Sequence, residues 1–225
     1  MIIVTGASRG LGKAITERLV EKGEEVLGLA RNTSRMKIKA IECDVSDYSS
    51  VKKASKEVKR MKKTVKAFIN SAGVASMNMA VTTDESTVQK LIQTNLVGTI
   101  YCCQLFAPLM LRQKQGSFIN FSTIAVSLAL KGESVYAASK AGVESFSRTF
   151  AKEMADFNIR VNCIAPGPIR TDLLRGITDA QIEKITSQQV IPKQFQKSDV
   201  CDLVELLIDE KAASLSGQVL NVGGV

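Results

Sequence analysis

The stretch Ile2-Ile3-Val4-Thr5-Gly6-Ala7-Ser8-Arg9-Gly10-Leu11-Gly12 decides the fold. Its first four residues predict a short buried strand, and the apolar spacing that follows predicts a helix over residues 11–22, closed by Gly23. The three glycines of the stretch let the backbone turn tightly and approach a pyrophosphate group, to which a helix N-terminus offers unpaired N–H groups and a partial positive charge. The loop therefore predicts a dinucleotide site, although a glycine loop in this place is also often only a turn.

Strand and helix patterns alternate along the rest of the chain. Strands are predicted over residues 25–30, 37–43, 65–70, 116–122, 159–164 and 218–222. Helices are predicted over 52–66 (after an N-cap at Ser46), 84–113, 134–157 and 199–209, and residues 166–195 form a looser segment. Crossovers of more than about ten residues imply parallel strands. Residues 1–225 are therefore predicted to form one domain, a doubly wound parallel α/β sheet of about seven strands with helices on both faces, which binds ligands beyond the carboxyl ends of its strands.

The chain contains no histidine, and this excludes several kinds of site. Ser-His-Asp and Cys-His nucleophile systems cannot form, nor can a metal site that needs imidazole. We expect no metal. Any acid or base must then be a tyrosine, a lysine, a cysteine or a carboxylate.

Composition points to an ordinary folded protein, with 45% hydrophobic and 23% charged residues. No apolar run approaches the roughly 18–20 residues of a membrane span, so we expect no membrane partner. Five cysteines lie scattered in apolar contexts without a CxxC pair. This pattern is typical of buried thiols in a reducing compartment, and we expect a cytoplasmic protein without a targeting peptide.

Much of the net charge of +8 is concentrated in one helix. Between Lys52 and Lys66 the chain carries eight basic residues and one acidic residue, Glu57, with apolar residues every three or four positions. The pattern indicates an amphipathic helix with a basic outer face. That face is either simply solvated or a docking surface for an acidic partner, such as a carrier protein, a membrane surface or nucleic acid. No aromatic residue lies between the lysines, so we expect no nucleic acid.

The end of the second predicted strand bears on which nucleotide binds. A site specific for NAD places Asp or Glu there to accept a hydrogen bond from the ribose 2′-hydroxyl. Here Arg31 follows the strand, and Arg9 lies in the glycine loop. Two guanidinium groups suit a 2′-phosphate, so these residues predict NADPH rather than NADH, unless both are ordinary surface arginines.

Tyr136 and Lys140 lie four residues apart near the start of a long predicted helix, so their side chains share one face. To donate and accept protons near neutral pH, the tyrosine needs its pKa lowered by about 3 from its usual value near 10. The lysine cation and a positively charged nicotinamide ring would lower that pKa by favouring the phenolate. Thr123 lies thirteen residues before the tyrosine, at the end of the fifth predicted strand.

Five motifs occur in order: the glycine loop, Asn70-Ser71-Ala72-Gly73, Asn95 in a helix, Thr123 with Tyr136 and Lys140, and Pro166-Gly167-Pro168-Ile169-Arg170-Thr171. Together they resemble the short-chain dehydrogenase/reductase family over essentially the whole chain. The set looks most like the family's 3-oxoacyl-[acyl-carrier-protein] reductase branch. The resemblance implies a homo-oligomer, commonly a tetramer and otherwise a dimer, that works without a metal.

The resemblance also implies roles for individual residues. Tyr136 would be the general acid in reduction, and Lys140 would bind the nicotinamide ribose and lower the pKa of the tyrosine. Asn95 would hold a water in a proton relay, unless it is an ordinary helix asparagine. The remaining cofactor contacts fall on the phosphates (Gly6, Ser8, Arg9, Leu11, Gly12), the adenine (Asp44, Val45), the groove (Asn70, Ala72) and the carboxamide (Ile169, Thr171). Thr171 and Asp172 can also be read as the N-cap of a following helix.

Three positions depart from the family pattern. The active-site serine is replaced by Thr123, whose hydroxyl can still donate, while Ser122 is expected to point to the opposite side of the strand. Carrier-protein reductases usually have a basic residue just before the sixth strand, where this chain has Asp156-Phe157-Asn158. The chain also lacks the usual aspartate before the glycine pair that follows Asn221-Val222.

The leading interpretation is an NADPH-dependent reductase of a carbonyl substrate, with Tyr136, Lys140, Asn95 and Thr123 at the site and residues 166–195 as a substrate lid. The substrate could be a 3-oxoacyl thioester, a steroid-like ketone, a sugar or a small ketone. One alternative is a catalytically weakened cofactor-binding regulator or scaffold, which the replacement by Thr123 would explain. Another is a protein that docks to nucleic acid or acidic surfaces through the Lys52–Lys66 helix, with redox activity secondary.

Overall fold

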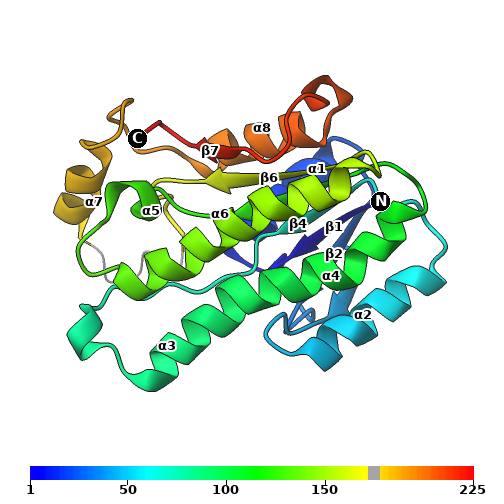
Figure 1. The fold of residues 1–225 in the computed structure, drawn as a ribbon, viewed down its shortest axis with the longest axis horizontal. Helices are drawn as coiled ribbons and strands as arrows, with labels where there is room; N and C mark the ends of the chain where they lie inside the picture. Colours follow the sequence, from blue (N-terminus) through cyan, green and yellow to red (C-terminus); the bar gives the residue numbers. More distant parts are fainter. Residues whose placement is uncertain (172–177) are drawn as a thin grey trace.

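The structure, a computed structural model, describes residues 1–171 and 178–225. At its centre lies a seven-stranded sheet in the order β3-β2-β1-β4-β5-β6-β7 (Figure 1), and every neighbouring pair is parallel. The strands are β1 Ile2–Thr5, β2 Val26–Ala30, β3 Ala40–Glu42, β4 Ala67–Asn70, β5 Gly116–Phe121, β6 Ile159–Ala165 and β7 Val219–Asn221. The predicted doubly wound parallel sheet is confirmed, and its order reverses between β1 and β4.

Helices cover both faces of the sheet, as predicted (Figure 1). One face packs against α2 Tyr48–Arg60, α4 Gly98–Leu111 and α6 Ser134–Ala155, and the other against α1 Gly10–Glu21 and α8 Lys197–Ile208. The smaller helical elements are η1 Ala80–Thr82, α3 Glu85–Leu91, the π-helix η2 Ile92–Val97, α5 Ala125–Leu128, α7 Asp179–Thr186 and η4 Glu210–Ala212. On the face covered by α2, α4 and α6, the ring of Phe68 packs against the rings of Phe106 and Phe118 at the centre of the core.

Three local predictions were wrong. The helix predicted over residues 52–66 is α2 at Tyr48–Arg60, because the chain leaves the helix at Lys62, which adopts φ +53°. The N-cap of α2 is Asp47, whose carboxylate accepts from the Ser49 N–H at 2.9 Å, because Ser46 instead donates its hydroxyl to Asp44. The third strand covers three residues rather than seven, since β3 is an edge strand that pairs only with β2.

The predicted amphipathic character of α2 is confirmed. Val51, Ala54 and Val58 are buried against the sheet, while all eight basic side chains between Lys52 and Lys66 are exposed. Lys63 and Lys66 form ion pairs with Glu25 and Glu24.

We expected no apolar stretch of membrane-spanning length, but the helical run Glu85–Leu111 reaches that length. By length and composition alone it is long and apolar enough to cross a membrane, but 44% of its most apolar window is buried inside the protein. Cys102, Cys103 and Phe106 are fully buried there, so packing on the sheet accounts for the apolar composition. All five cysteines are buried and unpaired, which confirms the prediction of buried thiols.

Candidate active site

The loop between β1 and α1 packs tightly against the segment that follows β4. Gly6 adopts φ +67°, and a Cβ on it would lie 2.9 Å from the Cα of Ala72. A Cβ on Gly12 would lie 2.5 Å from the carbonyl oxygen of Gly6, so both positions require glycine. The Thr5 hydroxyl accepts from the Ala72 N–H at 3.0 Å and joins the two segments. The loop is thereby held as a cradle that larger residues would fill.

The N-terminus of α1 is open toward that cradle. Its N-cap, Arg9, makes no side-chain hydrogen bond to the first turn, and the first turn carries no acidic residue. The unpaired N–H groups and the helix dipole are therefore left to attract an anion, which fits a pyrophosphate. Ser8 and Arg9 are exposed beside it, and Leu11 is half-buried.

The segment after β6 reaches the same loop. A Cβ on Gly10 would lie 4.0 Å from the Cβ of Thr171, and Ile169 is buried. The structure thus brings the residues predicted for the phosphates and those predicted for the carboxamide to one edge of the sheet, above the point where the strand order reverses.

The two arginines lie at neighbouring strand ends. Arg31 directly follows β2, which pairs with β1 with Leu29 opposite Thr5, and the Ala7 N–H in the glycine loop donates to the Leu29 carbonyl at 3.4 Å. Arg9 and Arg31 are both exposed, and no carboxylate of residues 1–171 or 178–225 forms an ion pair with either. Both cations are therefore available to an anionic ligand.

The two residues predicted for the adenine lie just beyond β3 and are held firmly. Asp44 accepts from the Ser46 N–H at 2.9 Å and from the Ser46 hydroxyl at 2.6 Å. Val45 is buried, and its carbonyl oxygen would lie 2.9 Å from a Cβ on Gly98.

Asn70 is placed differently from the expectation that it lines the groove. Its side chain is 4% exposed and donates to the Asn120 side-chain oxygen at 2.8 Å, inside the core. An amide at the end of a central strand finds its partner on the adjacent strand, and Asn120 lies directly opposite on β5. Only the backbone of Asn70 remains to line the groove, next to Ala72.

Three of the four predicted catalytic residues meet where β5 ends. The Thr123 hydroxyl lies beside the Tyr136 phenol, close enough to lower its pKa, and accepts from the Ala125 N–H at 3.2 Å. Lys140 lies one helical turn beyond the tyrosine, is 6% exposed, and donates from Nζ to the Phe121 carbonyl at 2.8 Å. A hydroxyl and a phenol in contact form a pair that can polarise and protonate one oxygen atom.

The electrostatics of this pair differ from the sequence expectation. Burial raises the pKa of Tyr136 to about 12, with a further contribution from the Glu133 carboxylate that outweighs the hydrogen bond from Thr123. Burial also lowers the pKa of Lys140 to about 8. Lys140 does not lower the pKa of the tyrosine here, because its ammonium is directed at the Phe121 carbonyl. The phenol therefore keeps its proton at neutral pH, as a general acid requires.

Asn95 lies in the π-helix η2, is fully buried, and is already paired. Its Oδ1 accepts from the Val74 N–H at 2.9 Å, and its Nδ2 donates to the Val74 carbonyl at 2.9 Å and to the Ser139 hydroxyl at 3.0 Å. A Cβ on Gly73 would lie 3.3 Å from Asn95 Oδ1 and 3.6 Å from Lys140 Nζ, so the asparagine is close to the site. π-bulges are frequent at functional sites. Its side chain clamps the segment after β4 to α6.

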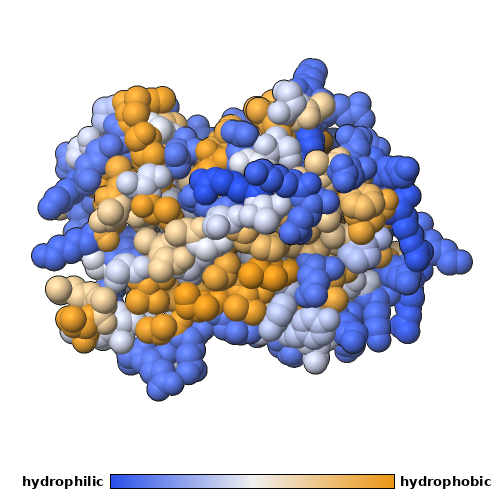
Figure 2. Space-filling view, in the orientation of Figure 1, coloured by the Kyte–Doolittle hydropathy of each residue, from blue (hydrophilic) through white to orange (hydrophobic). Residues whose placement is uncertain are grey.

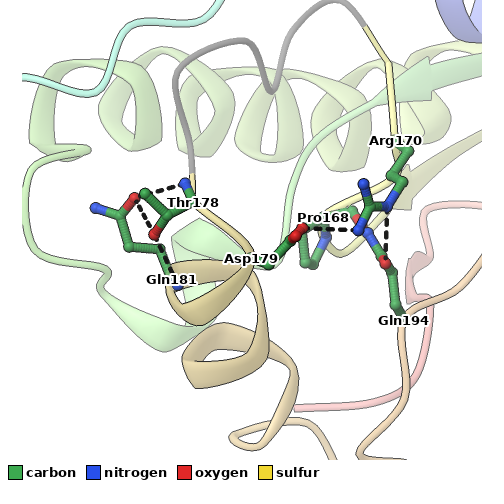
Figure 3. A network of polar contacts seen from close by, with 6 residues as sticks. All are labelled: Pro168, Arg170, Thr178, Asp179, Gln181 and Gln194. Carbon is green, nitrogen blue, oxygen red and sulfur yellow. Dashed lines mark hydrogen bonds and ion pairs between the residues drawn. The ribbon is translucent and has the colours of Figure 1, made fainter.

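Polar contacts join the described parts of the predicted lid, residues 166–171 and 178–195 (Figure 3). Arg170 donates to Asp179 at the start of α7 at 2.7 Å and to Gln194 at 3.4 Å, and Gln194 donates to the Pro168 carbonyl at 3.1 Å. The N-cap of α7 is Thr178, whose hydroxyl accepts from the Gln181 N–H. The interpretation of Thr171 and Asp172 as the N-cap of a following helix falls on residues 172–177, which lie outside the described residues.

An open cavity lies where this segment meets α8. Its volume is about 480 Å³, and its lining comes from Ile169, Arg170, Gln194, Phe195, Gln196, Lys197 and Ser198. None of the four predicted catalytic residues lines it.

Ser122 is committed to α6. Its hydroxyl donates to the Glu144 carboxylate at 2.6 Å, while the backbone pairing with the segment of β6 continues past Phe121, from the Ser122 N–H to the Ile164 carbonyl and from the Ile124 N–H to the Pro166 carbonyl. Sequence analysis missed Glu144, although its position four residues after Lys140 was a usable signal.

Comparisons with known proteins agree with this geometry. A family model described as short chain dehydrogenase matches residues 1–182. The 3-oxoacyl-[acyl-carrier-protein] reductase FabG of Staphylococcus aureus is 33% identical over 238 residues, which cover 99% of this chain and 96% of that protein. Carbonyl reductase family member 4 of Xenopus laevis is 32% identical over 229 residues, which cover 98% of this chain and 95% of that protein.

Solved structures give the same result for the fold. An aldohexose dehydrogenase of Thermoplasma acidophilum in ligand-free form has a TM-score of 0.89 and 29% identity, covering 99% of this chain and 92% of that one. A short-chain type dehydrogenase/reductase of Mycobacterium ulcerans has a TM-score of 0.91 and 26% identity, covering 98% and 87%.

Proposed function

The chain belongs to the short chain dehydrogenase family, and on that premise we propose that it is an NADPH-dependent reductase that converts a carbonyl group to an alcohol. The observation that carries the proposal is the contact between the Thr123 hydroxyl and the Tyr136 phenol beyond the end of β5, with Lys140 one turn further along α6. This contact also favours an active enzyme over a weakened regulator or scaffold, since Thr123 occupies the place that the serine would take.

The glycine cradle and the open N-terminus of α1 support binding of the cofactor pyrophosphate. Arg9 and Arg31 are exposed at adjacent strand ends and are suited to a 2′-phosphate, which is why we propose NADPH over NADH. When bound, the nicotinamide would supply the hydride for the carbonyl carbon.

The residues of the chain itself supply the proton and the polarity. We assign Tyr136 as the proton donor to the carbonyl oxygen, since its phenol is protonated at neutral pH and lies beside Thr123. The pKa of the phenol would be lowered by the positive charge that develops on the nicotinamide ring, which favours release of the proton. We assign Thr123 as a hydrogen-bond donor to the same oxygen as negative charge develops there. We assign Lys140 to the nicotinamide ribose, and Asn95 to positioning of the segment after β4.

For the substrate class we propose a 3-oxoacyl thioester or another ketone, because a 3-oxoacyl-[acyl-carrier-protein] reductase and a carbonyl reductase both match nearly the whole chain. An acidic carrier protein would then be a natural partner. Met77 and Met79 are partly exposed in the loop after β4, which favours a substrate wall over core packing. Residues 166–195 would close over the substrate.

We also propose a homo-oligomer, a tetramer or a dimer. Figure 2 shows an apolar band across the face that α4 and α6 cover, where Leu105, Leu109 and Phe146 are only partly buried. We place the enzyme in the cytoplasm, where its five buried thiols would stay reduced.

The proposal is tested by following NADPH consumption with a panel of 3-oxoacyl thioesters, cyclic and aliphatic ketones and sugars. We expect turnover with at least one class, and a strong preference for NADPH over NADH. Absence of turnover with every carbonyl compound, in protein shown to bind NADPH, would contradict a reductase.

A further inference from the structure

Helix α6 carries a ladder of polar side chains that continues beyond the catalytic pair. Tyr136, Lys140, Glu144 and Arg148 follow one another at four-residue intervals and therefore share one face of the helix. The first two belong to the proposed site. The third, Glu144, is a carboxylate that the proposed reaction does not use, yet it is 6% exposed.

Three consecutive residues at the end of β5 each contact one step of this ladder. The Phe121 carbonyl accepts from Lys140 at 2.8 Å, and the Thr123 hydroxyl lies close enough to the Tyr136 phenol to lower its pKa. Between them, the Ser122 hydroxyl donates to Glu144 Oε1 at 2.6 Å, and both groups are buried. The Ser122–Glu144 bond is thus the central one of three contacts that dock the strand end on α6.

Both carboxylate oxygens of Glu144 accept hydrogen bonds. While Oε1 accepts from Ser122, Oε2 accepts from Arg148 Nη2 at 3.2 Å, one turn further along the helix. A buried carboxylate persists only where its oxygens are paired, because an unpaired buried charge is strongly destabilising. The arrangement therefore favours one fixed position for the Ser122 hydroxyl, and Ser122 is the residue directly before Thr123.

We propose that Glu144 is a positioning residue, which acts through Ser122 to hold the Thr123 hydroxyl against Tyr136. Backbone bonds from Ser122 N–H to the Ile164 carbonyl at 2.8 Å and from Ile124 N–H to the Pro166 carbonyl at 3.1 Å tie this turn to the sheet. The Ser122–Glu144 bond ties it to α6, so its loss would change how Thr123 is placed relative to Tyr136 on that helix. Misplacement of a reacting group by about 1 Å can cost on the order of a hundredfold in rate. The expected loss of rate rests on the proposed function, whereas the expected change in the surroundings of Tyr136 does not.

The kinetic test uses Ser122→Ala, Glu144→Leu and the double variant, with reduction of a 3-oxoacyl thioester by NADPH as the assay. We expect each single variant to lower kcat about tenfold, with KM and the Kd for NADPH within about threefold of wild type. The double variant is expected to be no slower than the slower single variant, because both changes remove the same link. Glu144→Gln keeps an acceptor oxygen for Ser122 and should restore most of the rate.

Ser117→Ala is the matched control. Ser117 lies at the other end of β5, is 1% exposed and donates to the Leu207 carbonyl at 3.0 Å. Its loss should lower the melting temperature without changing kcat. If Ser122→Ala and Glu144→Leu behave in the same way, the pair is merely structural and the proposal is wrong. A kcat for Glu144→Gln as low as that for Glu144→Leu would also contradict it.

A second readout needs no turnover. The chain has three tyrosines, so ¹³C-labelled tyrosine gives three resolvable ring signals. In Ser122→Ala and Glu144→Leu we expect the Tyr136 signal to move as the Thr123 hydroxyl is displaced from beside the phenol, while the signals of Tyr48 and Tyr101 stay in place. An unchanged Tyr136 signal would overturn the proposal. If no carbonyl compound is reduced, the proposed function fails, and this measurement still decides the role of Glu144.

Discussion

Replacement of Thr123 by valine isolates the hydroxyl that departs from the family pattern. Valine keeps the branched shape of threonine and removes only the oxygen, so packing is nearly unchanged. The oxygen makes two contacts, one with the Tyr136 phenol and one with the Ala125 N–H at 3.2 Å. Loss of the second contact should lower the free energy of unfolding by about 1 kcal/mol.

The effect on catalysis should be much larger than the effect on stability. A hydrogen-bond donor aimed at a developing oxyanion is worth roughly 2.7–4 kcal/mol, or a factor of about 10²–10³ in kcat. We therefore expect Thr123→Val to reduce kcat on that scale, while Thr123→Ser retains activity or increases it. Steady-state NADPH consumption measures the rate, and thermal unfolding measures the stability.

A Thr123→Val enzyme with a kcat within about fivefold of wild type would refute this reasoning, since loss of a hydrogen-bond donor to the oxyanion should lower kcat far more. A loss of rate that is proportional to a loss of folded protein would also contradict a catalytic role for the Thr123 hydroxyl. Thr123→Ser serves as the control, because it keeps the hydroxyl and removes only the methyl group.

Three further changes test other parts of the site. The wild type should bind NADPH at least about tenfold more tightly than NADH, and equal affinities would contradict the assignment. Arg31→Asp should reverse this preference, because a carboxylate repels the 2′-phosphate and accepts a hydrogen bond from the 2′-hydroxyl. Gly12→Ala should weaken NADPH binding by at least about tenfold, measured by fluorescence titration, since the new Cβ would lie 2.5 Å from the Gly6 carbonyl oxygen. Lys140→Met should remove part of the pH dependence of stability. The folded pKa of Lys140, about 8, lies below its ordinary 10.5, so the unfolded chain binds more protons between these values. The wild type should therefore gain unfolding free energy relative to Lys140→Met as the pH rises from 8 to 10.5, and parallel curves would show that the lysine is not buried as described.

The fold was predictable because its signals are local. The glycine loop between β1 and α1 is required by contacts of Gly6 and Gly12 with backbone atoms, and the buried strands are short, mostly apolar runs. Spacing alone placed Tyr136 and Lys140 on one face of α6, and the parallel sheet brings strand ends to one edge.

The parts that could not be predicted depend on contacts between distant residues. The pKa of Tyr136 follows from its burial and from the direction in which Lys140 points, and neither is written in the spacing of the motif. Asn70 turns inward because Asn120 lies opposite on β5, a partner fifty residues away. The bond between Ser122 and Glu144 needs the end of β5 and the middle of α6 in register, which only the packed structure provides.

The most direct test of the central claim is NADPH consumption by wild type and Tyr136→Phe with the same carbonyl substrate. Phenylalanine removes the proton donor and leaves the glycine cradle and the arginines in place. General acid catalysis is typically worth about 10²–10⁴, so kcat should fall by at least about a hundredfold while the Kd for NADPH stays within a few-fold. A Tyr136→Phe enzyme that keeps more than about a tenth of the wild-type kcat would show that another group delivers the proton.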